Sequence, residues 1–184
     1  MVKPSKSNET GSVYELREAT LEDIDSIIAV ERSAWFSTYP SEEAEITRED
    51  VVARFSPEFI SQRKEEIGRE IMEGHRYMIV TKDNITVGYS HGLKLEEYND
   101  LVEVYVTELS QGIGKMLIRD LFNWFGDHKP IRLEVATYNK NAIDVYEHYG
   151  FRLREDLRQE DDESWNVLPS GKRIPVQFME KPAD

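Results

Sequence analysis

The sequence predicts an α+β fold: a mixed, mostly antiparallel sheet flanked by helices and arranged in α/β/α layers. The first observation is a meander, because β-rich runs over residues 76–81, 85–95 and 101–106 follow one another with only short turn signals between them. The second is that the chain then reads as helix, strand, helix and strand, which makes the sheet mixed. The third is helical periodicity before the meander, which supplies helices to cover the sheet.

The amino-terminal elements are recognised by their start signals. A short strand is expected over residues 13–17, and Thr20 then caps a helix whose apolar residues recur at three- and four-residue steps. Ser56 followed by Pro57 starts a second helix, because Ser caps helices and Pro suits the first helical position. Residues 35–40, between the two helices, are aromatic and turn-prone, so we expect a loop there.

The carboxyl-terminal elements follow the same logic. Residues 82–84, Lys-Asp-Asn, signal a hairpin turn within the meander. The run Ile131–Ala136 is a buried strand pattern, and the short helix after it begins at Asn139. Gly150 stands where a left-handed helix cap is needed. A final strand is expected over residues 174–181.

Length and composition narrow the class of protein. A chain of 184 residues suffices for one domain with a full core, which we assign to residues 13–184, with residues 1–12 as a disordered polar tail. The connection over residues 152–173 is longer than the fold requires. The lack of Cys excludes disulfides, thiolate metal sites and a Cys nucleophile. No apolar run could span a membrane and no signal-peptide core is present, so we expect a cytoplasmic protein without a membrane partner.

The net charge of −13 bears on the choice of partner. A strongly acidic surface repels a phosphate backbone, which argues against nucleic acid, and attracts cations. Polyamines, lysine side chains and amino-terminal amines fit this charge. Solubility alone explains the acidity equally well, because the charge belongs to the whole surface.

A glycine-rich turn follows the last meander strand. Gly112 and Gly114 open the next amphipathic helix, and neither carries a side chain that would keep a ligand from the main chain. The N–H groups of the helix terminus then face one point, where a phosphate would bind, and Lys115 would add a positive charge. A lone Gly-x-Gly is weak evidence, since glycine also serves plain turns.

Three motifs together resemble a known family. They are Val-Tyr-Val from Val104, Gly-x-Gly-Lys-x-Leu from Gly112, and Asn-x-x-Ala-x-x-x-Tyr-x-x-x-Gly-Phe from Asn139. This pattern resembles the GNAT superfamily of acetyl-CoA-dependent N-acetyltransferases, closely over residues 101–152 and in element order over residues 13–181. The resemblance implies a GNAT-like fold and acetyl-CoA as cosubstrate, with pantetheine between two splayed strands and pyrophosphate on the glycine loop.

The loop before the helix departs from the family pattern. Residues 107–110 form a shorter loop than usual, and Leu109 stands where the family has Gln or Arg. Side-chain contacts to pyrophosphate are therefore doubtful, whereas backbone N–H donation depends only on loop geometry. The resemblance assigns coenzyme A to these residues: Val104, Tyr105, Val106, Leu109, Ser110, Gln111, Gly112, Ile113, Gly114, Lys115, Asn139 and Tyr146.

Tyr146 is the candidate acid for the leaving thiolate, because the family places a tyrosine at the matching position of its second motif. The alternative is a core tyrosine that packs with Ala142 and Tyr149 at helical spacing. Asn139 opens the same helix, where its side chain would cap the terminus or contact coenzyme A. The two uses are compatible.

The candidate general base is Glu103, with Asp100 as the alternative, because related enzymes draw a carboxylate or an ordered water from this strand. Alternation places the two residues on opposite faces, which a bulge would reverse. A solvated strand-edge charge explains either residue. His91 has a suitable pKa but lies alone in a strand. The other histidines lack metal-ligand spacing and the acidic run over residues 160–163 reads as a solvated loop, so no metal site is expected.

The expected acceptor is a primary amine that attacks the thioester directly in a ternary complex. Its specificity would come from residues 35–39, the helix from Pro57 and the long loop ending near Arg173. An acyl-CoA-binding sensor without turnover is the alternative function. A dinucleotide-binding domain fits less well, because the glycine turn follows an antiparallel meander. A homodimer is an open alternative to a monomer.

Overall fold

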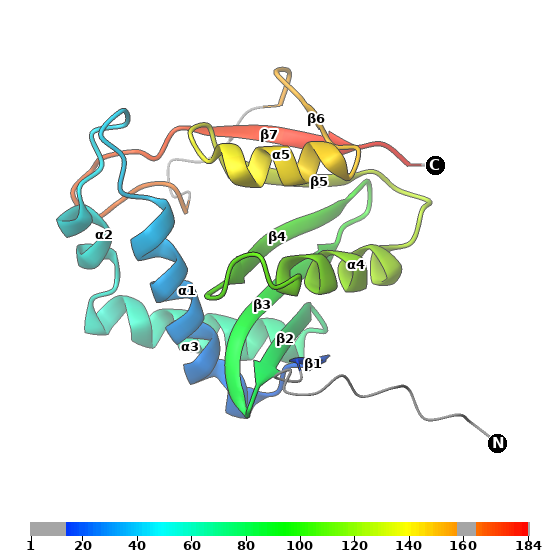
Figure 1. Ribbon diagram of the computed structural model, residues 1–184, viewed down its shortest axis with the longest axis horizontal. Helices are drawn as coiled ribbons and strands as arrows, with labels where there is room; N and C mark the ends of the chain where they lie inside the picture. Colours follow the sequence, from blue (N-terminus) through cyan, green and yellow to red (C-terminus); the bar gives the residue numbers. More distant parts are fainter. Residues whose placement is uncertain (1–13, 158–164, 184) are drawn as a thin grey trace.

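The computed structural model describes residues 14–157 and 165–183, which form a seven-stranded sheet in the order β1-β2-β3-β4-β5-β7-β6 (Figure 1). All neighbouring strands run antiparallel except β4 and β5, which are parallel. The predicted mixed, mostly antiparallel sheet is therefore confirmed. The strands are β1 (Tyr14–Glu18), β2 (Arg76–Lys82), β3 (Ile85–Lys94), β4 (Asn99–Val106), β5 (Ile131–Ala136), β6 (Arg152–Leu153) and β7 (Val176–Lys181).

Helices cover both faces of the sheet, as the α/β/α layering predicts (Figure 1). Alternate strand residues serve the two faces: Tyr77 and Ile79 pack with the α1 and α3 helices, whereas Met78 and Val80 pack with the α4 helix. The α5 helix joins α4 on its face, over β5. The helices are the 3₁₀ turn η1 (Leu21–Asp23), α1 (Ile24–Thr38), α2 (Arg48–Arg54), α3 (Pro57–Met72), α4 (Ile113–Phe125) and α5 (Lys140–His148).

The first helical segment begins as predicted but ends later. Thr20 and Asp23 form a capping box, and the carboxylate of Asp23 is held by Arg17 at 2.7 Å. The expected loop over residues 35–40 is wrong, because α1 continues to Thr38 and buries Trp35. Burial of this aromatic side chain among Tyr39, Phe55 and Trp165 outweighs the turn preference of its neighbours.

The short α2 helix was not expected from the sequence. Its signal is present, since the Thr47 hydroxyl accepts a hydrogen bond from the Asp50 N–H and the Asp50 carboxylate accepts one from the Thr47 N–H. The predicted start of α3 is confirmed: Ser56 caps the helix by accepting the Phe59 N–H at 3.2 Å.

A β-bulge in β4 changes which side chains share a face. The register shifts so that Leu101 is opposite Gly92 and Glu103 is opposite His91, which leaves Val102 as the extra residue. The strict alternation that places Asp100 and Glu103 on opposite faces is therefore wrong. Both carboxylates now act electrostatically on His91, which lies on the α1 and α3 side of the sheet.

The parallel pair β4 and β5 separates soon after it forms. Only Asn99 with Ile131 and Asp100 with Arg132 are paired, although β4 continues to Val106 and β5 to Ala136. The two strands therefore splay over most of their length. A cavity lined by residues of both strands lies in this gap.

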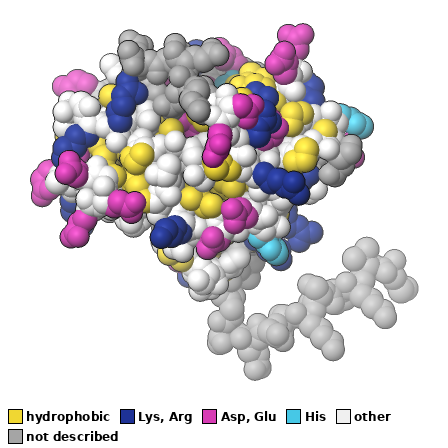
Figure 2. All heavy atoms as spheres, turned by 90° about the horizontal axis from the view of Figure 1, so that it is seen from above, with side chains coloured by type: hydrophobic (Ala, Val, Ile, Leu, Met, Phe, Trp, Pro, Cys, Tyr) yellow, Lys and Arg dark blue, Asp and Glu magenta, His cyan; other side chains and the backbone are white. Residues whose placement is uncertain are grey.

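The acidic and basic side chains are interspersed on the face seen in Figure 2. Several of the acidic residues are paired, including Asp50 with Lys172 and Glu108 with Lys82. On this face the net charge of −13 does not gather into one acidic field.

No helix within the described ranges is long and apolar enough to cross a membrane. The predicted tail (1–12) and acidic run (160–163) lie outside the described residues.

Candidate active site

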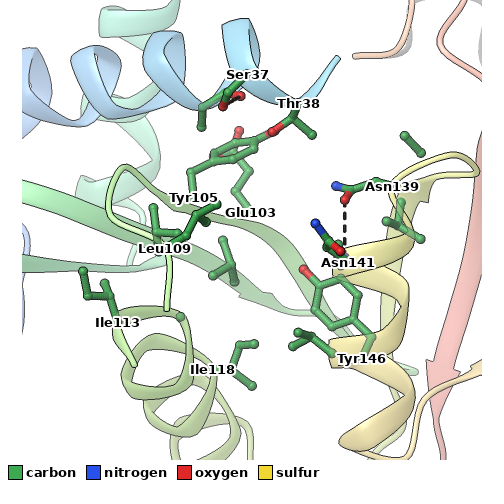
Figure 3. A pocket seen from close by; sticks show the side chains of 18 of the residues that line it. Ser37, Thr38, Glu103, Tyr105, Leu109, Ile113, Ile118, Asn139, Asn141 and Tyr146 are labelled. Atoms are coloured by element: carbon green, nitrogen blue, oxygen red, sulfur yellow. Dashed lines mark hydrogen bonds between the residues drawn. The ribbon is translucent and has the colours of Figure 1, made fainter. Parts of the chain in front are cut away.

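A cavity of about 970 Å³ lies where β4 and β5 splay (Figure 3). The end of α1, the loop before α4, the first turn of α4 and the α5 helix complete its walls. All but one of the predicted site residues line it; Gln111 is absent from the lining. The lining includes Glu103, Val104, Tyr105, Val106, Leu109, Ser110, Gly112, Ile113, Gly114, Lys115, Asn139 and Tyr146.

The start of α4 forms an anion cradle at one end of the cavity. Gly112 adopts φ 78°, a left-handed conformation that suits glycine, and it caps the helix. The Met116 N–H makes the first helical bond, to the Gly112 carbonyl at 3.0 Å, so the N–H groups of the preceding turn point outward. A Cβ built on Gly112 or Gly114 would meet no atom within 4 Å. This open space over helix N–H groups fits a phosphate.

Tyr146 extends from α5 into the cavity, with its hydroxyl toward the space between the splayed strands (Figure 3). Burial raises its pKa to about 12, so the phenol keeps its proton at neutral pH. Within residues 14–157 and 165–183 the hydroxyl has no hydrogen-bond partner. The ring also packs on Phe151, with 5.6 Å between centroids. Tyr146 therefore has both the packing contact of a core residue and a hydroxyl that is free to donate its proton.

The two ends of α5 have the predicted caps. Asn139 accepts the Ala142 N–H at 3.3 Å, and it also borders the cavity. Gly150 has φ 91°, and the Phe151 N–H then bonds the Tyr146 carbonyl at 3.1 Å. These caps fix the helix that carries Tyr146.

Glu103 borders the cavity from β4 and is held by charged and polar partners. Arg63 donates to its two carboxylate oxygens at 2.9 and 2.8 Å, and the Tyr89 hydroxyl donates at 3.1 Å. Burial favours a raised pKa, but Arg63, His91 and Tyr89 outweigh it and lower the pKa of Glu103 to about 2. Glu103 is therefore ionised at neutral pH and a weak base.

Asp100, the alternative base, has the opposite combination of properties. Burial and the charge of Glu134 raise its pKa to about 6, which suits a base near neutral pH. Asp100 is not among the residues that line the cavity. Glu103, which borders the cavity, is therefore a weaker base than Asp100, which does not.

Sequence reasoning missed Arg63 and Glu31 as residues of the site. The Arg63 side chain is 10% exposed, and its guanidinium also bonds Glu31 at 3.3 Å and Glu66 at 2.8 Å. The sequence does contain a signal for Arg63, because this charged residue stands on the apolar face of α3. A charged residue that is buried there must have a partner of opposite charge. Its partners on α1 and β4 come from distant parts of the chain.

The wall of the cavity near the end of α1 is aromatic and hydroxyl-rich. Tyr39 and Tyr105 share a hydrogen bond of 2.9 Å between their hydroxyls, and Tyr138 donates to the Tyr39 carbonyl at 2.8 Å. Trp165 packs on Tyr39 with centroids 5.8 Å apart, and its indole N–H bonds Glu134 at 2.8 Å. Two predicted acceptor segments, the end of α1 and the long loop, therefore meet here, whereas α3 contributes through Arg63 behind Glu103.

Glu31 supplies a prediction about pH. Burial and the charge of Glu103 raise its pKa to about 7, against the pull of Arg63. A pKa raised by folding stabilises the protein below the unfolded value, and this contribution is lost as pH rises through the folded pKa. We expect stability to fall by about 1 kcal/mol between pH 6 and 8 through this group. Glu31→Gln should flatten that part of the profile.

The measurement is chemical denaturation of wild type and Glu31→Gln at several pH values. Taking the difference between the two proteins removes the contributions of all ionisable groups that behave alike in both. Parallel pH profiles would show that Glu31 does not hold a proton near neutral pH.

Comparison with known proteins adds to this geometry. The family described as "Acetyltransferase (GNAT) domain" matches residues 38–166. The chain belongs to the GNAT acetyltransferase family. The predicted family is confirmed, and with it the assignment as an acyltransferase. No curated protein sequence matches the chain significantly.

Solved GNAT structures share the fold at low identity. PaiA N-acetyltransferase from Thermoplasma acidophilum, in complex with coenzyme A, is 19% identical with a TM-score of 0.60, over 92% of this chain and 99% of that one. The ribosomal-protein-S18-alanine N-acetyltransferase from Escherichia coli is 16% identical with a TM-score of 0.65, over 94% and 95%. A phosphinothricin acetyltransferase from Sinorhizobium meliloti, in complex with acetyl-CoA, is 16% identical with a TM-score of 0.62, over 92% and 88%.

The GNAT fold accounts for the position of the cavity. The glycine turn at α4 is one of the motifs on which the sequence resemblance rested, and the splay of β4 from β5 is a feature that the resemblance implied. The predicted cosubstrate agrees with the coenzyme A and acetyl-CoA bound in two of these relatives.

Proposed function

We propose that this GNAT protein transfers an acetyl group from acetyl-CoA to a primary amine by direct attack in a ternary complex. One observation carries the proposal: a single cavity joins an anion cradle, a protonated tyrosine and a partly buried, ionised carboxylate. The cradle is at the α4 terminus, Tyr146 is on α5 and Glu103 is on β4. These are the groups that acetyl transfer to an amine requires.

The cradle and the strand edges would hold the cosubstrate. The outward N–H groups of the first α4 turn, with Lys115 beside them, suit the pyrophosphate. The β4 edge beyond Asp100 is unpaired on the β5 side, so its backbone groups can bond pantetheine amides and polarise the thioester carbonyl. Leu109 contributes only backbone and an apolar surface, since it is 73% exposed and carries no donor side chain.

Tyr146 would supply the proton for the leaving group. The amine nitrogen forms a bond to the thioester carbonyl carbon, the C–S bond breaks, and the sulfur takes the electron pair. A phenol whose pKa is about 12 keeps its proton at neutral pH and would donate it to the sulfur as the C–S bond breaks. Because this pKa is above the value of about 8.5 for a free thiol, the transfer is uphill, and reprotonation of the phenolate draws it forward. Solvent returns the proton to the phenolate.

Glu103 would attract the cationic amine but would not act as the base that accepts its proton. A carboxylate with a pKa of about 2 holds a cationic amine by charge but leaves its proton to bulk water. Attack needs the neutral amine, so the proton must be lost before or during the reaction. The rate should therefore rise with pH as the acceptor amine deprotonates.

The class of acceptor is a primary amine, often on a cationic molecule. The partly buried carboxylates of Glu103 and Glu134, beside Tyr39 and Tyr105, provide charge and aromatic contact for an alkylammonium group. The names of the solved relatives cover a ribosomal-protein alanine and phosphinothricin, so the fold does not select between protein and small-molecule acceptors. The cytoplasmic location and the homodimer stay predictions.

The test is coenzyme A release with acetyl-CoA and a panel of polyamines, peptides and aminoglycosides. Initial-rate lines should intersect, and kcat/KM for the amine should rise about tenfold per pH unit below the amine pKa. Parallel lines with a trapped acetyl-enzyme would contradict direct attack. Acetyl-CoA binding without turnover across the panel would favour the sensor function.

A further inference from the structure

Two histidines and a carboxylate meet behind the active-site cavity. Glu70, His75 and His91 each present a ligand atom, and these atoms lie within 4.8 Å of one another. His75 Nδ1 and His91 Nε2 are 3.0 Å apart. Two nitrogens bound to one tetrahedral zinc ion are about 3.3 Å apart, given Zn–N bonds of 2.0–2.1 Å. The nitrogen pair therefore needs only a small movement to share an ion.

The fold brings these residues together from separate elements. Glu70 is in the last turn of α3, and the turn through Gly74 carries His75 back so that its N–H bonds the Glu70 carbonyl at 3.0 Å. His91 reaches the same point from β3, where it is opposite Tyr77 of β2. A site anchored on helix, turn and strand is preorganised.

Two of the three residues in this cluster, Glu70 and His91, face groups of the kind that surround metal ligands. The Tyr77 hydroxyl donates to Glu70 Oε2 at 2.6 Å, and the Tyr77 ring stacks on His91 with centroids 4.1 Å apart. His91 is 3% exposed; its Nδ1 is buried without a hydrogen-bond partner among the described residues, and Glu103 Oε2 lies 3.7 Å away. A metal-bound histidine characteristically directs its other ring N–H to a carboxylate.

We propose that Glu70, His75 and His91 bind a divalent transition metal ion, with Zn²⁺ as the best match. Two imidazoles and one carboxylate are a donor set that zinc accepts, and the partial exposure of His75 leaves a fourth position for water. The positive charge of Arg63 would repel a metal ion at this site, because Arg63 Nη1 lies 3.9 Å from Glu70 Oε2. The carboxylates of Glu66 and Glu103 already neutralise that guanidinium.

The proposed site would connect to the cavity through His91. A metal ion on Nε2 fixes the proton on Nδ1, which faces Glu103. The imidazole then becomes a donor to the carboxylate, which already accepts from Arg63 and Tyr89. Metal binding would thus alter the surroundings of Glu103 without contact to the anion cradle.

The test is Zn²⁺ titration of the metal-stripped full chain by calorimetry, with Co²⁺ absorption as a second readout. Wild type should bind Zn²⁺ at this site and give the intense visible bands of tetrahedral Co²⁺. His75→Ala should weaken zinc affinity by about 100-fold or more and remove those bands, because one of the three ligands is lost. The matched control is His128→Ala, since the His128 side chain is 96% exposed and far from this cluster in the chain.

The alternative is a plain hydrogen-bonded histidine pair. Absence of zinc binding to wild type at about 100 µM, or equal affinity in wild type and His75→Ala, would overturn the proposal. If His75→Ala fails to fold, the zinc affinity of Glu70→Gln and the Co²⁺ spectrum of wild type test the proposal in its place. Octahedral Co²⁺ bands, or unchanged affinity in Glu70→Gln, would also overturn it. None of these readouts depends on acetyl transfer.

Discussion

Gly114→Asp should abolish acetyl-CoA binding while leaving the unliganded protein as stable as wild type or more so. Wild type at a hundredfold excess of acetyl-CoA over Kd gains about 2.7 kcal/mol, which raises Tm by about 5–10 °C in a domain of this size. In the variant a carboxylate stands in the open space where phosphate would lie. The repulsion should weaken binding by about 100-fold or more, which removes the shift.

The stability of the unliganded variant follows from the position of Gly114. This residue is in the first turn of α4, where an added Cβ would have no neighbouring atom within 4 Å and where φ is not positive. Replacing a helical glycine by aspartate contributes only about 0.1–0.4 kcal/mol of helix propensity, because aspartate is itself a modest helix former, and its negative charge at the helix N-terminus adds about 0.3–1 kcal/mol. Gly112 is a poorer test site, because its φ of 78° makes any side chain strained.

Asn123→Asp is the matched control, because it places the same charge on an exposed position near the other end of α4. It should keep the full acetyl-CoA shift, measured by thermal melting and calorimetry. Normal acetyl-CoA affinity in Gly114→Asp would place the phosphate site elsewhere. No acetyl-CoA shift in wild type would remove the cofactor proposal.

The parts of the fold that the sequence predicts depend on local chemistry. Ser56 and Asn139 cap their helices as expected, and Gly150 ends α5, because each acts on groups within a few residues of itself. The glycine turn is predictable for the same reason. Gly112 and Gly114 leave open space over the helix terminus.

The missed features depend on contacts between distant segments. The extra residue Val102 turns Asp100 and Glu103 to one face, and nothing in the alternating pattern of β4 marks it. The pKa difference between these two carboxylates likewise needs Arg63, 40 residues from Glu103. The pairing of His75 with His91 joins two residues whose sequence spacing has no metal-ligand signature.

Tyr146→Phe should lower kcat by about tenfold to a thousandfold while the fold and acetyl-CoA affinity are retained. The substitution removes only the hydroxyl, and the ring keeps its packing on Phe151. The hydroxyl has no hydrogen-bond partner within the described residues, so its loss leaves no buried group unpaired. A structural role would therefore predict little change in either stability or turnover, whereas the acid role predicts a loss confined to turnover.

The measurements are kcat by coenzyme A release, the acetyl-CoA shift in Tm, and a single-turnover rate that isolates chemistry from product release. Tyr98→Phe serves as the control, because Tyr98 is outside the cavity lining and stacks on Arg132. It should turn over like wild type. An unchanged single-turnover rate in Tyr146→Phe would make Tyr146 a packing residue and require another proton source for the thiolate. A lower rate with an unchanged acetyl-CoA shift would locate the missing proton at this hydroxyl, the one group that the variant lacks.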